Sequence, residues 1–251
     1  MKLLILSDIH GNRFGLEAVL KSVGSFDALL CLGDVVGYGA HPNECCEILL
    51  QHEAICLSGN HDAAALGLID TEWFNDIAAW AINWTRQQLT PENANWLRSL
   101  PSAQEFTEWN LQAVHGSLRN PWEEYITDMS MAAATMRLMS QRLCFFGHTH
   151  QAVVYATSLD SQEELVWSDF EAVPLPHGGE FEWEDDWRFL VNPGSCGQPR
   201  DGNPQARYAT LDFETGLVKV EAVDYDVEAA RRAILDAGLP RPLGDRLLRG
   251  R

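Results

Sequence analysis

The chain has 251 residues, of which 46% are apolar and 10% aromatic, so it can form one sizeable core and is too hydrophobic to be disordered. Its 18 basic and 36 acidic residues give a formal charge of -18, which argues against broad binding to nucleic acids or to anionic membranes. The six cysteines lack C-x-x-C spacing, and no apolar run reaches the ~18 residues of a membrane span. We expect one cytoplasmic domain over residues 1–251.

Strands and helices alternate in the first part of the chain. The pattern predicts a buried strand over 2–6, a helix from Leu16 to Val23 that ends at Gly24, a strand over 28–32, a helix over 44–51 that follows Pro42, and a strand over 54–57. This βαβαβ order indicates a parallel sheet. Right-handed crossovers would bring the carboxyl ends of its three strands to one edge.

Residues 63–100 read as a helical insertion rich in tryptophan. One apolar helix is expected from Trp73 to Trp84, and Thr90 with Pro91 is typical of the start of a second. Tryptophans at helical spacing are usually part of a core, so we favour packing over a pocket wall or a dimer face. This insertion is nevertheless where we would look for a self-association surface.

The remaining chain is rich in predicted strands. We expect strands over 111–114, 143–146, 151–156, 164–167, 189–191, 208–213 and 217–223. An acidic loop is expected over 174–187, an amphipathic helix over 227–237, and a mobile tail over 240–251. The fold class indicated by the whole pattern is α/β.

Short cassettes of metal-binding residue types follow five of the predicted strands. They are Asp8-Ile9-His10, Gly33-Asp34, Gly59-Asn60-His61-Asp62, Val114-His115-Gly116 and Gly147-His148-Thr149-His150. Side chains at the carboxyl ends of neighbouring strands converge on one crevice. Strand alternation would point His148 and His150 to opposite faces, so this segment has to leave the sheet as a loop if both bind metal.

The cassettes supply carboxylate, amide and imidazole ligands but no thiolate, a set that suits divalent ions such as Mn, Fe, Zn or Ni. The candidate ligands are Asp8, His10, Asp34, Asn60, His115, His148 and His150. Seven ligands are too many for one ion. A carboxylate can bridge two ions ~3.5–4 Å apart, so Asp34 would join a pair of divalent metal ions.

These cassettes, in this order, resemble the calcineurin-like metallophosphoesterase family, and specifically its bacterial D-I-H-G-N branch, over residues 2–202. The resemblance implies a four-layer α/β/β/α sandwich of two mixed sheets with flanking helices. It also implies the division of the ligands: Asp8, His10, Asp34 and His150 around one ion, and Asp34, Asn60, His115 and His148 around the other.

The resemblance further implies hydrolysis of phosphodiesters or small phosphomonoesters by a hydroxide that bridges the metals. His61 would act as the general acid for the leaving oxygen. Arg13 and Arg200 are candidates for substrate contact, although a structural ion pair is an equal alternative for each. The expected partner is a small-molecule phosphate ester.

One departure bears on the substrate. Serine/threonine phosphatases of the superfamily carry an Asp-Arg pair where this chain has Gly37-Tyr38, which disfavours a phosphoprotein substrate. Two alternatives stay open: a hydrolase of dinucleoside polyphosphates, and a metal-binding scaffold without turnover. Scaffolds of this kind typically lose His61 or several ligands, and this chain has them all.

Overall fold

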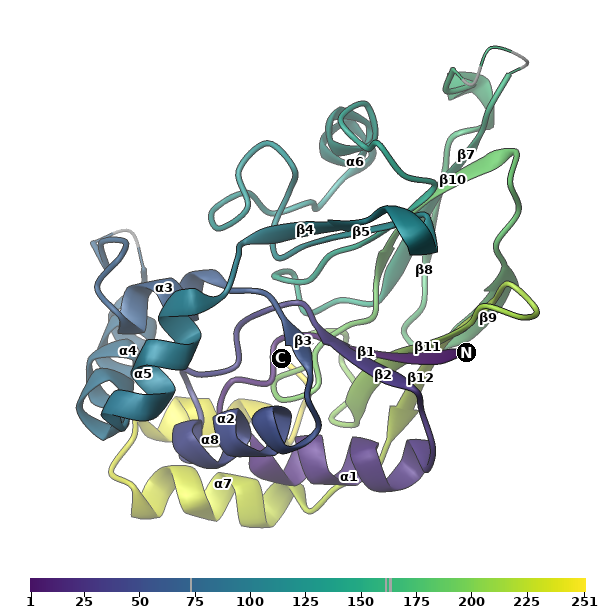
Figure 1. Cartoon of the computed structure of the whole chain (residues 1–251). Helices are drawn as coiled ribbons and strands as arrows, with labels where there is room; N and C mark the ends of the chain where they lie inside the picture. Colours follow the sequence, from purple (N-terminus) through teal and green to yellow (C-terminus); the bar gives the residue numbers. More distant parts are fainter. Residues whose placement is uncertain (73, 161, 163) are drawn as a thin grey trace.

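Two mixed β-sheets lie face to face with helices on their outer sides, in a computed structural model that describes residues 1–72, 74–160, 162 and 164–251 (Figure 1). This arrangement confirms the predicted four-layer α/β/β/α fold. Among the described residues, no helix combines the length and the apolar character needed to cross a membrane.

The first sheet carries the βαβαβ unit predicted from the sequence. Its order is β3-β2-β1-β11-β12-β9, formed by β1 (Lys2–Leu6), β2 (Ala28–Cys31), β3 (Ile55–Cys56), β9 (Gly179–Glu182), β11 (Ala206–Asp212) and β12 (Leu217–Val223). β1, β2 and β3 are parallel, whereas β11 pairs antiparallel with β1. The carboxyl ends of the three parallel strands therefore meet at one edge.

The second sheet places two further strand ends at the same side of the molecule. Its order is β4-β5-β6-β10-β7-β8, formed by β4 (Ala103–Phe106), β5 (Leu111–Val114), β6 (Leu143–Phe145), β7 (Val153–Ser158), β8 (Glu171–Pro174) and β10 (Trp187–Asn192). β5, β6 and β10 are parallel, and the outer pairs are antiparallel.

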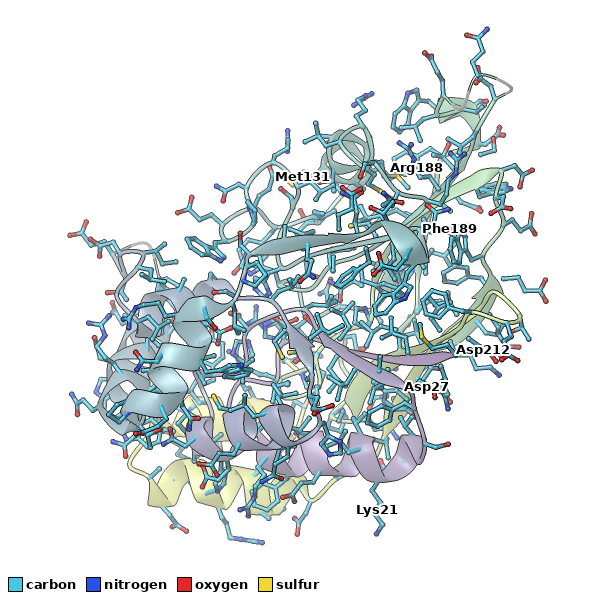
Figure 2. All side chains as sticks on the ribbon, viewed as in Figure 1. Lys21, Asp27, Met131, Arg188, Phe189 and Asp212 are labelled. Carbon is cyan, nitrogen blue, oxygen red and sulfur yellow. The ribbon has the colours of Figure 1, made fainter. Side chains whose placement is uncertain are left out.

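Helices cover the outer face of each sheet. They are α1 (Arg13–Val23), α2 (Pro42–Gln51), α3 (Asn60–Ala65), α4 (Asp76–Gln88), α5 (Pro91–Ser99), α6 (Met129–Met136), α7 (Val227–Asp236) and α8 (Arg241–Leu247). In Figure 1, α1, α2, α7 and α8 lie below the first sheet and α6 lies above the second. The polar side of α1 faces solvent, and Lys21 points away from the sheet in Figure 2.

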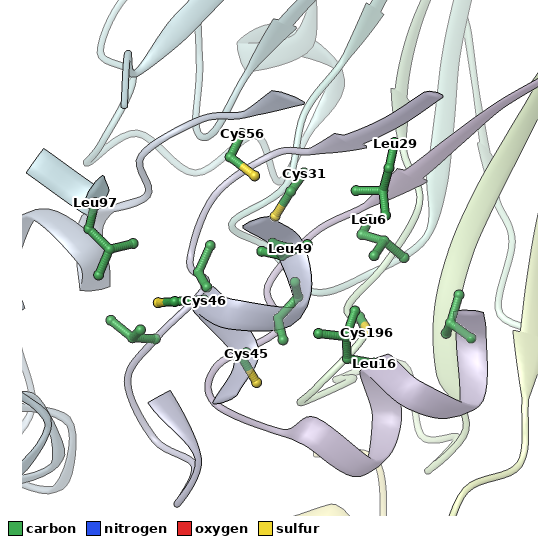
Figure 3. Packing of buried hydrophobic residues seen from close by; sticks show 14 of the residues in the cluster. Leu6, Leu16, Leu29, Cys31, Cys45, Cys46, Leu49, Cys56, Leu97 and Cys196 are labelled. Atoms are coloured by element: carbon green, nitrogen blue, oxygen red, sulfur yellow. The ribbon is translucent and has the colours of Figure 1, made fainter. Parts of the chain in front are cut away.

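Strand alternation divides the core into layers. Leu3 and Ile5 point into the cluster between the two sheets, whereas Leu4 and Leu6 point into the cluster between the first sheet and its helices. Figure 3 shows this second cluster, where five cysteines, Cys196 among them, pack against leucines. A buried thiol behaves here as a small apolar side chain. All six cysteines are free and buried.

The helical insertion is confirmed as α3, α4 and α5, and Thr90 caps α5 by accepting from the Asn93 amide at 3.2 Å. α4 begins at Asp76, and Trp73, which we expected in this helix, lies outside the described residues. Trp84 packs against the cluster under α7 and α8, but Trp80 is 46% exposed. Packing therefore accounts for only part of the tryptophan content.

Two predicted segments in the second half differ from the structure. Residues 164–167 do not form a strand: Leu165 makes an isolated bridge to Leu159, and a 3-10 helix begins at Trp167. The expected acidic loop over 174–187 contains strand β9, whose Phe181 packs on Phe189 with ring centroids 4.8 Å apart. The alternation of Glu180, Phe181 and Glu182 was the overlooked signal.

The predicted mobile tail over 240–251 is instead helix α8. Its Leu243 and Leu247, four residues apart, are buried against α4 and α7. In the sequence, Pro240 and Pro242 follow the end of the helix predicted over 227–237. In the structure both lie at the start of α8, where a missing amide hydrogen is tolerated.

Candidate metal centre

The loops after β1, β2, β3, β5 and β6 converge at one buried site, as the cassettes predicted. Backbone hydrogen bonds fix the loops to each other, from the Asp8 amide to Gly33 O at 3.1 Å, from His10 to Asp34 O at 2.8 Å, and from Gly147 to His115 O at 2.8 Å. The seven candidate ligands are all at most 2% exposed. The position of each ligand is thus set by backbone contacts between loops.

The structure brings the candidate ligands together in two groups that share one carboxylate. Asp8, His10, Asp34 and His150 form the first group, and Asp34, His115 and His148 form the second; within each, the ligand atoms lie within 4.8 Å of one another. Asn60 adjoins the second group, with its Oδ1 3.1 Å from His115 Nε2. These are the residues that the resemblance assigned to two ions.

Hydrogen bonds orient three imidazoles with one nitrogen toward the centre. The Nδ1 atoms of His10, His115 and His150 lie 3.2, 2.9 and 2.6 Å from the carbonyl oxygens of Val36, Leu32 and Gln198. A carbonyl only accepts, so each Nδ1 carries a hydrogen and each Nε2 is free to bind a cation.

Several features of the site fit a bound cation. The Nε2 atoms of His10 and His150 face each other at 3.1 Å, and His148 Nε2 is buried without a hydrogen-bond partner. Two neutral nitrogens whose hydrogens are on Nδ1 repel at that distance unless a positive charge lies between them. Imidazole and carboxylate ligands suit divalent transition metals, so these residues fit the metal ions that they would bind.

Backbone strain is concentrated at the same positions. Asp8, His10, Asp34, His148 and His150 all have left-handed φ angles between 50° and 66°. Such conformations cost roughly 1–3 kcal/mol each and persist where the surroundings enforce them, often at functional sites. They also confirm that the segment with His148 and His150 leaves the sheet, which lets both side chains face one point.

The electrostatics favour three neutral histidines and one protonated histidine beside an ionised carboxylate. Burial lowers the pKa of His10, His148 and His150 well below its ordinary value. Burial alone would raise the pKa of Asp34, but the neighbouring histidines, His115 foremost, lower it well below the usual range. Burial also opposes charge on His115, yet Asp34 raises its pKa to about 9. A proton on His115 thus compensates Asp34 in the absence of metal.

His61 lies beside the centre, outside both ligand groups. Its ring contacts His10, Tyr38 and Phe74, with centroids 4.8, 4.3 and 5.2 Å apart, and its amide donates to Asp34 Oδ1 at 2.8 Å. Its Nδ1 is buried without a hydrogen-bond partner. Burial lowers the pKa of His61 to about 4. His61 also lines a pocket of about 210 Å³ with Arg200.

The structure separates the two candidate arginines. Arg200 lines the pocket beside His61, as expected for a substrate contact. Arg13 opens α1, where its Nε lies 3.4 Å from Glu17 Oε1, and it does not line that pocket. Arg13 thus forms an ion pair, and its contact with substrate stays a prediction.

Sequence reasoning assigned no role to several residues around the site. Asp62 accepts the amides of Val35, Val36 and Gly59 at 3.0 to 3.2 Å and so joins two ligand loops. Its place in the G-N-H-D cassette was a signal for this contact. Tyr125 stacks on His148 with centroids 3.7 Å apart and, with Arg246, lines the pocket beside His61; no pattern in the sequence marked either residue.

A family model described as the calcineurin-like phosphoesterase superfamily domain matches residues 1–216. The chain is also similar to MJ0912, an uncharacterised protein of Methanocaldococcus jannaschii, with 34% identity covering 98% of this chain and 97% of that protein.

Two crystal structures resemble this fold over its whole length. A metallophosphoesterase from Sphaerobacter thermophilus is 36% identical with a TM-score of 0.87, covering 100% of this chain and 99% of that chain. The hypothetical protein PH1004 from Pyrococcus horikoshii is 22% identical with a TM-score of 0.76, covering 100% and 98%; this second likeness concerns the fold alone.

Proposed function

The chain belongs to the calcineurin-like phosphoesterase superfamily, and on that premise we propose that it hydrolyses phosphodiesters or small phosphomonoesters at a centre of two divalent metal ions. The observation that carries the proposal is Asp34, whose carboxylate belongs to both groups of candidate ligands. A shared carboxylate between two sets of ligands is typical of sites that clamp a phosphoryl group. Mn, Fe, Zn and Ni all suit these ligands.

In this proposal the two ions, when bound, neutralise phosphoryl charge and make water more acidic. The protein's own part is to hold the phosphate in place and to exclude bulk water, because the ligands are buried and the loops are fixed to each other. Arg200 would neutralise a phosphoryl oxygen from the pocket side.

His61 is proposed to donate a proton to the leaving oxygen as the bond to phosphorus breaks. A pKa of about 4 in the metal-free protein leaves the ring neutral near pH 7. The negative charge of a bound phosphate acts in the opposite direction and favours the protonated ring. Bound substrate therefore favours the protonated form of His61 that donation requires.

The test is hydrolysis of bis(p-nitrophenyl) phosphate and p-nitrophenyl phosphate by metal-stripped protein that is reloaded with Mn, Fe, Zn or Ni. We expect metal-dependent turnover, with kcat of His61→Ala lower by about 100-fold or more. His52→Ala is the matched control, because His52 is exposed at the end of α2. No turnover with any metal, despite two ions bound per chain, would favour the scaffold alternative.

We place the protein in the cytoplasm as part of this proposal. The support is that all six cysteines are free and buried, as expected of a chain that folds in a reducing compartment.

A further inference from the structure

Helix α8 places a second arginine beside the pocket that holds His61. Arg246 Nη1 and Arg200 Nη2 each donate to the same oxygen, Gln198 Oε1, at 3.2 Å. Gln198 is buried, and its carbonyl oxygen binds His150 Nδ1 at 2.6 Å. One residue thus fixes a ligand histidine through its backbone and two guanidinium groups through its side chain.

The two guanidinium groups have no acidic side chain to neutralise them. Within the described part of the chain, neither Arg200 nor Arg246 forms an ion pair with Asp or Glu, and Arg200 Nε is buried without a hydrogen-bond partner. Arg246 Nε donates to the main-chain oxygen of Arg251 at 2.7 Å. By contrast, Arg231 and Arg241 both reach Asp245, at 2.8 and 3.1 Å.

A pair of arginines without an acidic side-chain partner among the described residues suits the binding of an anion. Burial and then the positive charge of Arg200 lower the pKa of Arg246, which reports two like charges at close range. Both arginines line the pocket of about 210 Å³ beside His61, so a bound anion would relieve this repulsion there. Guanidinium groups bind phosphate through several charge-assisted hydrogen bonds.

The two arginines lie at different depths. The charge of Arg200 contributes to the pKa shifts of Asp8 and of the ligand histidines at positions 10, 148 and 150, whereas the charge of Arg246 contributes to that of Tyr38. Arg246 also lines a larger neighbouring pocket of about 980 Å³. Arg200 therefore borders the metal centre, and Arg246 lies farther from it, on the side of His61.

The surrounding charge supports an anionic ligand. Residues 231–251 contain six arginines and two aspartates, a net charge of +4 in a chain whose total is -18. Five of these six arginines line the pocket of about 980 Å³, and Arg246 also lines the pocket beside His61, so the local charge on this side favours anions.

We propose that Arg246, together with Arg200, binds a second phosphoryl group, carried by the leaving group of the substrate. The proposal rests on the proposed function: within it, it points to esters whose leaving group carries a phosphate, and it extends the substrate class to phosphoric anhydrides. Water oxygen forms the new bond to phosphorus and releases a proton to solvent, the bond from phosphorus to the leaving oxygen breaks, and His61 protonates that oxygen and regains a proton from solvent. The second phosphoryl group departs with the leaving group.

Binding of inorganic pyrophosphate to the metal-free protein, measured by calorimetry, tests the arginine pair independently of catalysis. We expect Arg246→Gln to weaken binding at least tenfold and Arg246→Lys to weaken it less. Arg232→Gln is the matched control, because Arg232 is exposed on α7 and lines neither pocket, so its affinity should stay within twofold of wild type. Equal affinity in wild type and Arg246→Gln, or no binding by wild type, would overturn the proposal.

Kinetics with reloaded enzyme then compare inorganic pyrophosphate with p-nitrophenyl phosphate. Arg246→Gln should lower kcat/KM for pyrophosphate at least tenfold more than for the aryl ester. Equal losses on both substrates would refute the second phosphoryl site and leave the proposed function intact. If wild type hydrolyses neither of these substrates nor bis(p-nitrophenyl) phosphate, the proposed function fails, and the arginine pair is judged by pyrophosphate binding alone.

Discussion

The close contact between Gly37 and His61 gives a sharp test of the site. Gly37 has a φ of +94°, and a Cβ added there would lie 2.6 Å from His61 Nδ1 and 3.1 Å from its Cβ and Cγ. Gly37→Ala would therefore introduce both backbone strain and a collision with the candidate acid. Neither atom of this contact belongs to a candidate metal ligand.

Each part of the effect can be estimated. An ordinary contact starts at 3.4 Å, so the ring of His61 has to move by 3.4 − 2.6 = 0.8 Å. Left-handed backbone in a non-glycine residue costs about 1–2 kcal/mol, and overpacking adds about 1–3 kcal/mol, a loss of about 2–5 kcal/mol in unfolding free energy. A misplacement near 1 Å lowers a catalytic rate by up to ~100-fold.

The assay is kcat on bis(p-nitrophenyl) phosphate together with urea denaturation and metal content. Gly24→Ala is the control, because Gly24 also has a positive φ, +71°, but its added Cβ would meet nothing within 4 Å. We expect Gly24→Ala to lose only the strain energy of about 1–2 kcal/mol and to keep its activity. Full activity in folded, metal-loaded Gly37→Ala would refute the argument that the position of His61 controls turnover.

Three further predictions follow from the centre and its surroundings. Asp34→Asn should lower metal content below one ion per chain and activity by at least ~100-fold, since both ligand groups lose their shared carboxylate; mass spectrometry showing two retained ions would contradict this. Asp201→Asn should lower the unfolding free energy by about 3–5 kcal/mol in urea denaturation, because the fully buried Arg207, 2.8 Å from Asp201, loses its counter-charge. A loss under about 1 kcal/mol would show that another group neutralises Arg207. In metal-free protein, the pKa of His61 is lowered from 6.5 to about 4, so the contribution of His61 to stability is present above pH 6.5 and is lost as pH falls toward 4. The difference in unfolding free energy between wild type and His61→Gln should therefore shrink by up to about 3 kcal/mol over that range. A constant difference would contradict the lowered pKa.

Local patterns in the sequence were sufficient for the fold class and for the ligand residues. Strands β1, β2, β5 and β6 are short apolar runs that end in polar cassettes, and the parallel arrangement of such strands puts their ends at one edge. The type of each ligand side chain is a property of the sequence, so Asp34 and its partners could be named before any contact was known. The alternation rule also required the loop that carries His148 and His150.

Only the tertiary structure decided which residues surround that centre. Arg246 reaches Gln198 because Leu243 and Leu247 anchor α8 in a core formed by α4 and α7. The spacing of the two leucines is helical, but residues 240–251 alone do not indicate which helices they pack against. Tyr125 and Asp62 act through contacts with distant loops. The sequence determines the chemistry of side chains and the period of each element. The meeting of groups far apart in the chain depends on packing and on strained backbone, whose energies are set by the whole fold.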